Sequence, residues 1–180
     1  MKSICVFCGA SDDVDSTYLD SARAMGKGIA QRGLRLVYGG GGTGLMGAVA
    51  DGALSAGGEV VGIIPEFFNS VEKAHSTLTH MEVVTNLHIR KARMAELVEG
   101  FIALPGGFGT LEELFEVLTW SQIGLHHKPI GLLNHQNYFD PLIDFLEAMD
   151  QKGFTRQTPS ELYHIAKESD GLLASMLNHN

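Results

Sequence analysis

The chain is poor in the features that mark secreted, membrane-spanning or nucleic-acid-binding proteins. No apolar run approaches the ~18 residues that a membrane span requires, and the start shows no signal-peptide pattern. The 13 lysines and arginines are outnumbered by 21 aspartates and glutamates, which gives a net charge of −8. DNA and RNA are bound by basic faces, so this balance argues against a nucleic-acid partner. We therefore expect a cytoplasmic protein that binds neither membrane nor nucleic acid.

Metal and redox patterns are also lacking. The eight histidines show no H-x-x-x-H or similar spacing, and His126 and His127 precede a Lys-Pro turn. The two cysteines, Cys5 and Cys8, form a C-x-x-C sequence, which is a redox motif when it opens a helix. Here it lies inside the apolar strand pattern ICVFC, where side chains three residues apart point to opposite faces. We expect no metal, no cofactor and packing roles for both thiols.

The chain does contain a regular alternation of apolar strands and helices. Strands are predicted at 3–8, 34–38, 59–64, 81–84, 101–104, 129–133 and 163–166. One helix is predicted from Asp15 or Ser16 to about 32. Two more begin where the glycine loops end, one running from just after 44 to 56 and one from just after 109 to about 123. The remaining helices are predicted at 87–98, 139–152 and 170–177. Continuously apolar strands are typical of a parallel sheet covered on both faces. We predict a single domain, 1–180, with an α/β fold: a Rossmann-like, doubly wound parallel sheet with helices on both faces.

Many of the 22 glycines gather in loops between a strand and a helix. The first such loop is YGGGGTGLMG, residues 38–47, and it contains the G-x-G-x-x-G dinucleotide fingerprint at Gly42, Gly44 and Gly47. Free amides at the start of the following helix can bind an anion. Glu66, past the next strand, could then bind a ribose. An NAD-dependent enzyme is therefore an alternative, although the fingerprint usually follows the first strand and not the second. A tight turn without a ligand is another alternative.

The second loop, PGGFGT at residues 105–110, again joins a strand to a helix. It lacks the Gly-Lys-Ser/Thr of a Walker A sequence. Its amides and the hydroxyl of Thr110 suit one phosphate monoester. The helix continues into Glu112 and Glu113, which would repel a phosphate if both faced it. At least one of them should therefore face another group, unless both only stabilise the start of the helix.

A third element is a basic sequence at the start of the helix at 87–98. It contains Arg90, Lys91 and Arg93. Cations near a helix N-terminus are poorly placed with respect to the helix dipole. Arg90 therefore calls for a phosphate or a buried carboxylate as its partner, unless this is simply a solvated basic face.

Taken together, these sequences resemble the LOG ("Lonely Guy") family. PGGFGTLEE, residues 105–113, matches the family signature P-G-G-x-G-T-x-x-E. The likeness extends over nearly the whole chain, through the sequences at 5–11 and 39–47, Glu72 with His75, Arg90 with Lys91 and Met94, and Trp120. The family comprises cytokinin riboside 5′-monophosphate phosphoribohydrolases, often mislabelled as lysine decarboxylases. The resemblance implies a homodimer that needs no metal and has its sites near the subunit interface.

The resemblance also implies roles for individual residues. Arg90 and Glu113 match the catalytic pair. His75, apart from the resemblance, could line the base pocket near Glu72 or could simply be a loop histidine with a structural hydrogen-bond partner. Residues matching substrate-binding positions are Gly42, Thr43, Glu72, Arg90, Lys91, Gly106, Gly107, Phe108, Gly109, Thr110, Leu111, Glu112 and Thr119. The implied reaction cleaves the N-glycosidic bond of AMP, or of an N6-modified AMP, to give the free base and ribose 5-phosphate.

Elementary chemistry supports this assignment. The ribose becomes oxocarbenium-like as the bond breaks, so a carboxylate such as that of Glu113 would stabilise the developing positive charge. Arg90 would keep Glu113 ionised, because a nearby cation lowers the pKa of a carboxyl group. A non-catalytic carrier of a nucleotide-like cofactor remains an alternative, since such carriers share the fold and the glycine loops. Pure binding does not require both Arg90 and Glu113.

Overall fold

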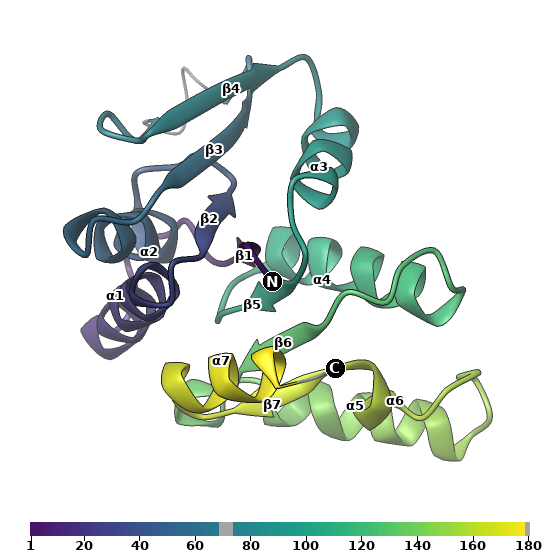
Figure 1. Cartoon of the computed structure of the whole chain (residues 1–180). Helices are drawn as coiled ribbons and strands as arrows, with labels where there is room; N and C mark the ends of the chain where they lie inside the picture. The colour runs from purple at the N-terminus through teal and green to yellow at the C-terminus, as the bar shows by residue number, and fades with distance from the viewer. Residues whose placement is uncertain (69–73, 179–180) are drawn as a thin grey trace.

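The computed structural model describes residues 1–68 and 74–178. Within them, one sheet contains seven strands, and every neighbouring pair is parallel (Figure 1). The strands are β1 (Ser3–Phe7), β2 (Arg35–Tyr38), β3 (Val60–Pro65), β4 (His80–Val84), β5 (Phe101–Ala103), β6 (Ile130–Leu133) and β7 (His164–Ala166). All seven predicted strands are confirmed, as is the predicted Rossmann-like fold.

The order of the strands, β4-β3-β2-β1-β5-β6-β7, fixes where a ligand can bind. The chain winds outward from β1 to β4 and then returns to place β5 against the other side of β1. In the register of this pair, Cys5 lies opposite Phe101 and Phe7 opposite Ala103. The strand order therefore reverses between β1 and β5, and ligands of such sheets bind outside the carboxyl ends of the strands at this point.

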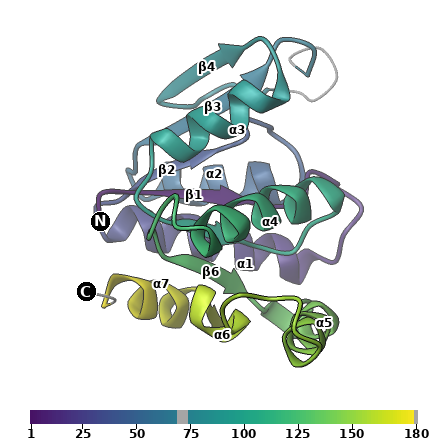
Figure 2. The same cartoon turned by 90° about the vertical axis from the view of Figure 1, so that its right-hand side faces the viewer.

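Helices cover both faces of the sheet (Figures 1 and 2). One face packs against α1 (Ser16–Gln31), α2 (Gly44–Ser55) and α7 (Ser169–Leu177). The other packs against α3 (Leu87–Glu96), α4 (Phe108–Gln122), α5 (Asp140–Gln151) and α6 (Pro159–Leu162). A short 3-10 helix, η1 (His135–Asn137), follows β6. The four residues of α6 and the three of η1 were not predicted, because segments this short show no helical periodicity.

Alternate residues of the central strands enter opposite cores, which explains why the strands are apolar throughout. Ile4 and Val6 are buried on the α1 face, whereas Cys5 and Phe7 are buried on the α4 face. Cys8 lies with the first group, so the two thiols belong to different cores and both are free. Burial raises the pKa of both thiols. The predicted packing roles of the cysteines are confirmed.

Local signals fix the ends of the helices that lead to the site. Asp15 caps α1 as predicted, since its Oδ1 accepts a hydrogen bond from the amide of Thr17 at 2.9 Å. Gly33 ends the same helix with a φ of +69°, a conformation that favours glycine. Asn86 caps α3 by accepting from the amide of Ile89 at 2.9 Å, which sets the first turn of the helix that carries Arg90.

Candidate active site

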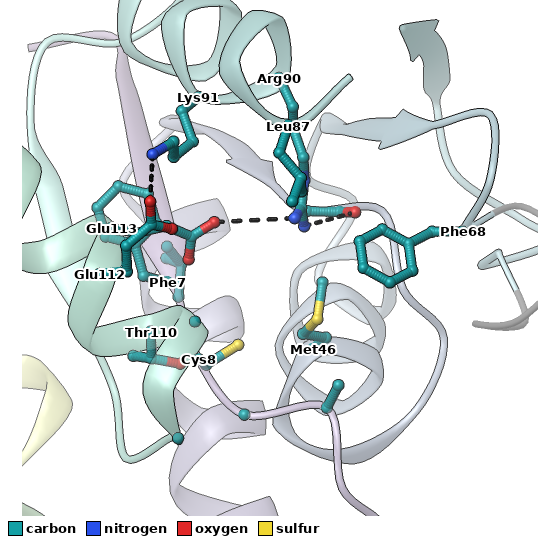
Figure 3. A pocket seen from close by; sticks show the side chains of 16 residues that line it. Phe7, Cys8, Met46, Phe68, Leu87, Arg90, Lys91, Thr110, Glu112 and Glu113 are labelled. Carbon is teal, nitrogen blue, oxygen red and sulfur yellow. Dashed lines mark hydrogen bonds and ion pairs between the residues drawn. The ribbon is translucent and has the colours of Figure 1, made fainter. Parts of the chain in front are cut away.

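A cavity of about 320 Å³ opens at the carboxyl ends of β1 and β5, where the strand order reverses. Its walls come from the turn after β1, the second glycine loop, and the facing sides of α3 and α4. Ten of its lining side chains are labelled in Figure 3: Phe7, Cys8, Met46, Phe68, Leu87, Arg90, Lys91, Thr110, Glu112 and Glu113. Lys91, Glu112 and Glu113 lie on one side, Met46 and Phe68 lie on the other, and Arg90 lies between them beside Leu87.

Arg90 is fixed in this cavity by two backbone carbonyls, one in β3 and one directly after β2. Its Nε donates to the carbonyl of Ile63 at 3.0 Å and its Nη2 to the carbonyl of Gly39 at 3.1 Å. The third nitrogen, Nη1, faces Oε1 of Glu113 at 3.9 Å (Figure 3). The side chain is 11% exposed, so the interpretation of Arg90 as part of a solvated basic face is wrong.

Glu113 is the buried acid of the site. Its side chain is 12% exposed, and it points from α4 into the cavity (Figure 3). Burial raises its pKa to about 7; Arg90 lowers that pKa, while Glu112 raises it. Arg90 lowers the pKa of Glu113 as expected, but the expectation that it keeps Glu113 ionised needs correction, because the desolvation cost outweighs the attraction of a cation 3.9 Å away. A carboxyl group with a pKa near 7 can gain or lose a proton at physiological pH.

The other acid of the pair has a different partner. Lys91 extends from α3 to Glu112, with 2.5 Å between Nζ and Oε1, and also to Oε1 of Glu116 at 3.1 Å. Burial opposes the charge of Lys91, but its hydrogen bonds to Glu112 and Glu116 raise its pKa. Both acids of the signature thus face cations of α3, and the prediction that at least one of them faces another group is confirmed. Glu116 was not predicted as part of this site.

The second glycine loop presents unpaired amides beside Glu113. Helix α4 begins at Phe108, and its N-cap Gly107 provides no side chain to cap it. The first amides of a helix have no partner within the helix, and they mark the positive end of its dipole. Gly107, Gly109 and Thr110 line the cavity, so these amides face a site of a size that suits a small anion.

Three other predicted residues of this loop lie outside the cavity lining. Phe108 is 94% exposed, and Leu111 packs against the apolar core. Gly106 supports the loop from behind, because a Cβ on it would lie 2.1 Å from Oγ1 of Thr110 and 2.8 Å from the amide nitrogen of Gly9. These positions shape the loop and do not face the cavity.

Tyr138 stabilises the second loop from the segment after β6, and no sequence pattern marked it. Its hydroxyl donates to the carbonyl of Gly106 at 2.6 Å. The two preceding residues, Gln136 and Asn137, have positive φ values of 51° and 59°, which are unfavourable for residues other than glycine. Strain of this kind persists where surrounding structure holds it, often next to a functional site.

The first glycine loop differs from the prediction. The amide of Gly44 donates to Oδ1 of Asp12 at 2.7 Å, and the hydroxyl of Thr43 donates to the carbonyl of Ala10 at 2.8 Å. The chain's own residues therefore occupy the start of α2. Gly42 and Thr43, predicted to bind substrate, do not line the cavity; Gly39 and Met46 do. The dinucleotide interpretation loses support, because a phosphate at this helix would have to displace Asp12.

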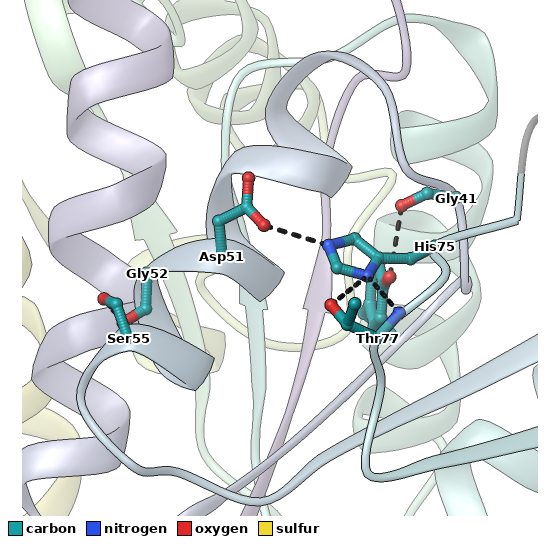
Figure 4. Close-up of polar contacts among 7 residues, drawn as sticks. Gly41, Asp51, Gly52, Ser55, His75 and Thr77 are labelled. Atoms are coloured by element: carbon teal, nitrogen blue, oxygen red, sulfur yellow. Dashed lines mark hydrogen bonds and ion pairs between the residues drawn. The ribbon is translucent and has the colours of Figure 1, made fainter.

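Two further predicted positions, His75 and Thr119, lie apart from the cavity, and a third cannot be placed. Glu72 is outside the described residues. His75 lies beyond the first loop, where its Nε2 is 3.0 Å from Oδ1 of Asp51 and its Nδ1 faces Thr77 (Figure 4). Thr119 lies further along α4, donates to a helix carbonyl at 2.7 Å, and lines a separate apolar groove between α4, α5 and α6. In one chain, therefore, neither His75 nor Thr119 joins Arg90 and Glu113.

Among residues 1–68 and 74–178, no three His, Cys, Asp or Glu side chains are grouped so that they could hold a metal ion. Over the same ranges, no helix is long and apolar enough to cross a membrane.

Known proteins are similar to this chain over most of its length. Residues 46–176 match a family described as possible lysine decarboxylase. The chain is 49% identical to the cytokinin riboside 5′-monophosphate phosphoribohydrolase of Rhodococcoides fascians, covering 97% of this chain and 89% of that protein. It is 45% identical to the enzyme LOG3 of Arabidopsis thaliana, covering 97% and 81%. Among solved structures, the molybdenum cofactor carrier protein of Chlamydomonas reinhardtii superimposes with a TM-score of 0.74 at 25% identity, covering 97% and 94%. The chain thus belongs to the possible lysine decarboxylase family, the family of the LOG phosphoribohydrolases.

Proposed function

We propose that this protein hydrolyses the N-glycosidic bond of purine nucleoside 5′-monophosphates, to give the free base and ribose 5-phosphate. The observation that carries the proposal is the meeting of two features in one cavity. A buried carboxyl group, Glu113, faces a fixed cation, Arg90, and lies next to the open N-terminus of α4. The first feature serves the chemistry and the second serves a phosphate. The activity in the names of the curated relatives supports the same reaction.

The phosphate would bind at the start of α4. The unpaired amides around Gly107 and Gly109 and the dipole of the helix favour a dianionic group there. Since Glu112 is neutralised by Lys91, it does not repel the phosphate as a free carboxylate would. Binding at this remote group holds the ribose in place, and that binding energy is available for the bond-breaking step.

Glu113 would then act at the anomeric carbon of the ribose. As the bond to the base breaks, the base leaves with the bonding electron pair and the sugar becomes positively charged. The ionised carboxylate stabilises that charge and accepts a proton from the water whose oxygen bonds to the anomeric carbon. The departing base takes up one proton from solvent, and Glu113 returns the proton it accepted to solvent, so one water is consumed for each bond cleaved and Glu113 is ready for the next turnover. Arg90 keeps part of the Glu113 population ionised near pH 7.

A comparison of nucleotide with nucleoside tests this function. The purified protein is incubated with AMP, an N6-modified AMP, and adenosine, and the free base is measured by chromatography. We expect kcat/KM for the best nucleotide to exceed that for its nucleoside by roughly 10²-fold or more, because the nucleoside lacks the group that α4 binds. Equal values for AMP and adenosine would refute the assignment of the α4 amides to the phosphate.

The likeness to the molybdenum cofactor carrier of Chlamydomonas reinhardtii favours a carrier as the second candidate function. A carrier would use the same open helix end to bind a phosphate, but it needs no ionisable acid beside the ribose. If AMP binds in calorimetry but no nucleotide in the panel yields a free base, the carrier is the better assignment.

We further propose that the base is adenine or an N6-modified adenine and that the protein works as a cytoplasmic homodimer. The apolar side chains of Met46, Phe68 and Leu87, which line the cavity, support an apolar ring system there. Phe154, 79% exposed, borders the groove that contains Thr119 and supports a second copy against this face. Thr119 could contact substrate only across such an interface. Light scattering of wild type and Phe154→Glu measures the assembly; a monomeric wild type would contradict it.

A further inference from the structure

Gly39, the first residue after β2, lines the cavity and lies against the guanidinium of Arg90. We propose that Gly39 is a positioning residue: its missing side chain admits the guanidinium of Arg90, which the carbonyls of Gly39 and Ile63 then hold against Glu113. The inference rests on the proposed function in so far as Arg90 and Glu113 act on a nucleotide. It assigns a purpose to one glycine of a loop whose other contacts lie within the protein.

The space at Gly39 is filled by Arg90. A Cβ built there would lie 1.8 Å from Nη2 of Arg90 and 3.0 Å from its Cζ. It would also lie 2.6 Å from Cε of Met46, which is the flexible end of a side chain and can move at little cost. The guanidinium cannot move in the same way, because its Nε and Nη2 are bonded to two backbone carbonyls.

The backbone gives no other reason for glycine at this position. Gly40, the next residue, has a φ of +80°, whereas Gly39 is not among the residues with positive φ. Alanine could therefore adopt the backbone of Gly39 and would be excluded only by the arginine. Since the carbonyl of Gly39 also accepts the Nη2 bond, this residue both makes room for the guanidinium and orients it.

The proposed consequence is electrostatic. The charge of Glu113 interacts with two cations of α3, Arg90 and Lys91, and with two acids of its own helix, Glu112 and Glu116. It also interacts with the thiols of Cys5, in β1, and of Cys8, which follows β1. Arg90 is the strongest of the cations that act on Glu113. A displaced guanidinium would leave the buried carboxyl with less opposing charge, so Glu113 would titrate at higher pH.

The test compares Gly39→Ala with the matched control Gly171→Ala. Gly171 lies exposed on α7, where a Cβ would come no closer than 3.8 Å to Ala166. We expect Gly39→Ala to lower kcat for AMP by roughly 10²-fold, because misplacement of a catalytic group by about 1 Å has effects of this size. We expect the carboxyl signal of Glu113, followed by ¹³C NMR, to titrate about one pH unit higher. Wild-type kcat and an unchanged titration in Gly39→Ala would overturn the proposal.

A double-mutant cycle covers the case in which Gly39→Ala folds poorly. In an Arg90→Ala background the obstructing guanidinium is absent, so adding Gly39→Ala should lower Tm far less than the roughly 5 °C expected in wild type. An equal loss of Tm in both backgrounds would overturn the proposal. The cycle and the titration need no turnover. A wild type that cleaves no nucleotide would therefore refute the proposed function, while the role of Gly39 would still be decided by these two measurements.

Discussion

The two glycine loops of this protein look alike in sequence and differ in what their backbones bind. Both follow a strand of the central sheet and open a helix, α2 in one case and α4 in the other. At α2, the amide of Gly44 is bonded to Asp12, and that of Met46 donates to the carbonyl of Gly9 at 3.2 Å. At α4, the N-cap residue Gly107 has no side chain that could cap the helix, and the loop lines the cavity.

The difference shows that a glycine loop predicts where the backbone approaches another group closely. It does not predict whether that group belongs to the protein or to a ligand. In the first loop the close neighbours belong to the protein, and the glycines make room for them. In the second loop the neighbour would be a ligand. Only the second helix carries acidic side chains into the same cavity, so binding and chemistry coincide there.

If the second loop is the working one, the largest effect should come from the acid on its helix. Glu113→Gln removes the charge that stabilises the ribose and accepts the proton, so kcat should fall roughly 10²-fold or more with the fold intact. Glu112→Gln is the matched control, because Glu112 is 62% exposed and faces Lys91; we expect it to change kcat far less. Steady-state kinetics with AMP decides. A Glu112→Gln variant that is inactive beside an active Glu113→Gln would reverse the assignment.

The pH dependence of the same acid should be nearly as large. Because the pKa of Glu113 is about 7, kcat/KM should fall about ten-fold for each pH unit below 7, as the carboxylate is protonated. The profile is measured from pH 5 to 9 in buffers of constant ionic strength. A flat profile down to pH 5 would mean that Glu113 is not the titrating group or is not needed in its ionised form.

Stability should respond to pH with the opposite sign. The pKa of Glu113 in the folded state is about 7, above its usual value of 4.5. Between these two pH values the folded state binds more protons than the unfolded state, so the free energy of unfolding decreases as pH rises towards and through 7. The whole shift corresponds to about 3 kcal/mol. Glu113→Gln is neutral at every pH and should therefore melt above wild type at pH 8, with a smaller difference at pH 5. Equal melting curves at pH 8 would contradict the burial of a charged Glu113.

One glycine from each loop tests the comparison directly. A Cβ on Gly47 would lie 2.4 Å from the backbone carbonyl oxygen of Gly42, so Gly47→Ala should cost about 1–3 kcal/mol and lower Tm. A Cβ on Gly107 meets nothing within 4 Å, so Gly107→Ala should keep its Tm within about 2 °C but raise KM for AMP roughly ten-fold, because the methyl group covers a phosphate donor. The reverse result, with KM altered by Gly47→Ala alone, would move the phosphate to the first loop.

Tyr138 should have a smaller effect on the second loop. Tyr138→Phe removes one hydrogen bond, to the carbonyl of Gly106, which is worth about 1 kcal/mol; KM for AMP should rise roughly five-fold. The control is Tyr163→Phe, which should leave KM for AMP unchanged, because Tyr163 lies in the groove beside α6 and not at the second loop. A Tyr138→Phe variant with wild-type KM would show that the loop holds its shape without this bond.

The sequence predicted the strands well because their signal is local. Runs such as ICVF and IGLL are buried on both faces, and the structure places strands at both. The pairing of Arg90 with an acid was also predictable, since a cation at a helix N-terminus calls for a partner. Asp12, Gly39 and Tyr138 were not predictable, because each acts on a residue 32 or more positions away. No pattern within a single segment encodes such a contact.

Asp12 provides the smallest expected effect and the strictest test of the difference between the loops. Asp12→Ala removes the acceptor at the amide of Gly44, so Tm should fall by roughly 2–4 °C, as for the loss of a helix cap worth about 1 kcal/mol. KM for AMP should stay unchanged if the phosphate binds at α4 alone. Asp13→Ala, the neighbouring exposed residue, changes the net charge equally and serves as the control. If α2 did contribute to the phosphate site, Asp12→Ala would free the amide of Gly44 to bind the phosphate. It would also remove a negative charge that repels the phosphate. KM would then fall in Asp12→Ala but not in Asp13→Ala, and the two loops would have to be treated as one anion site.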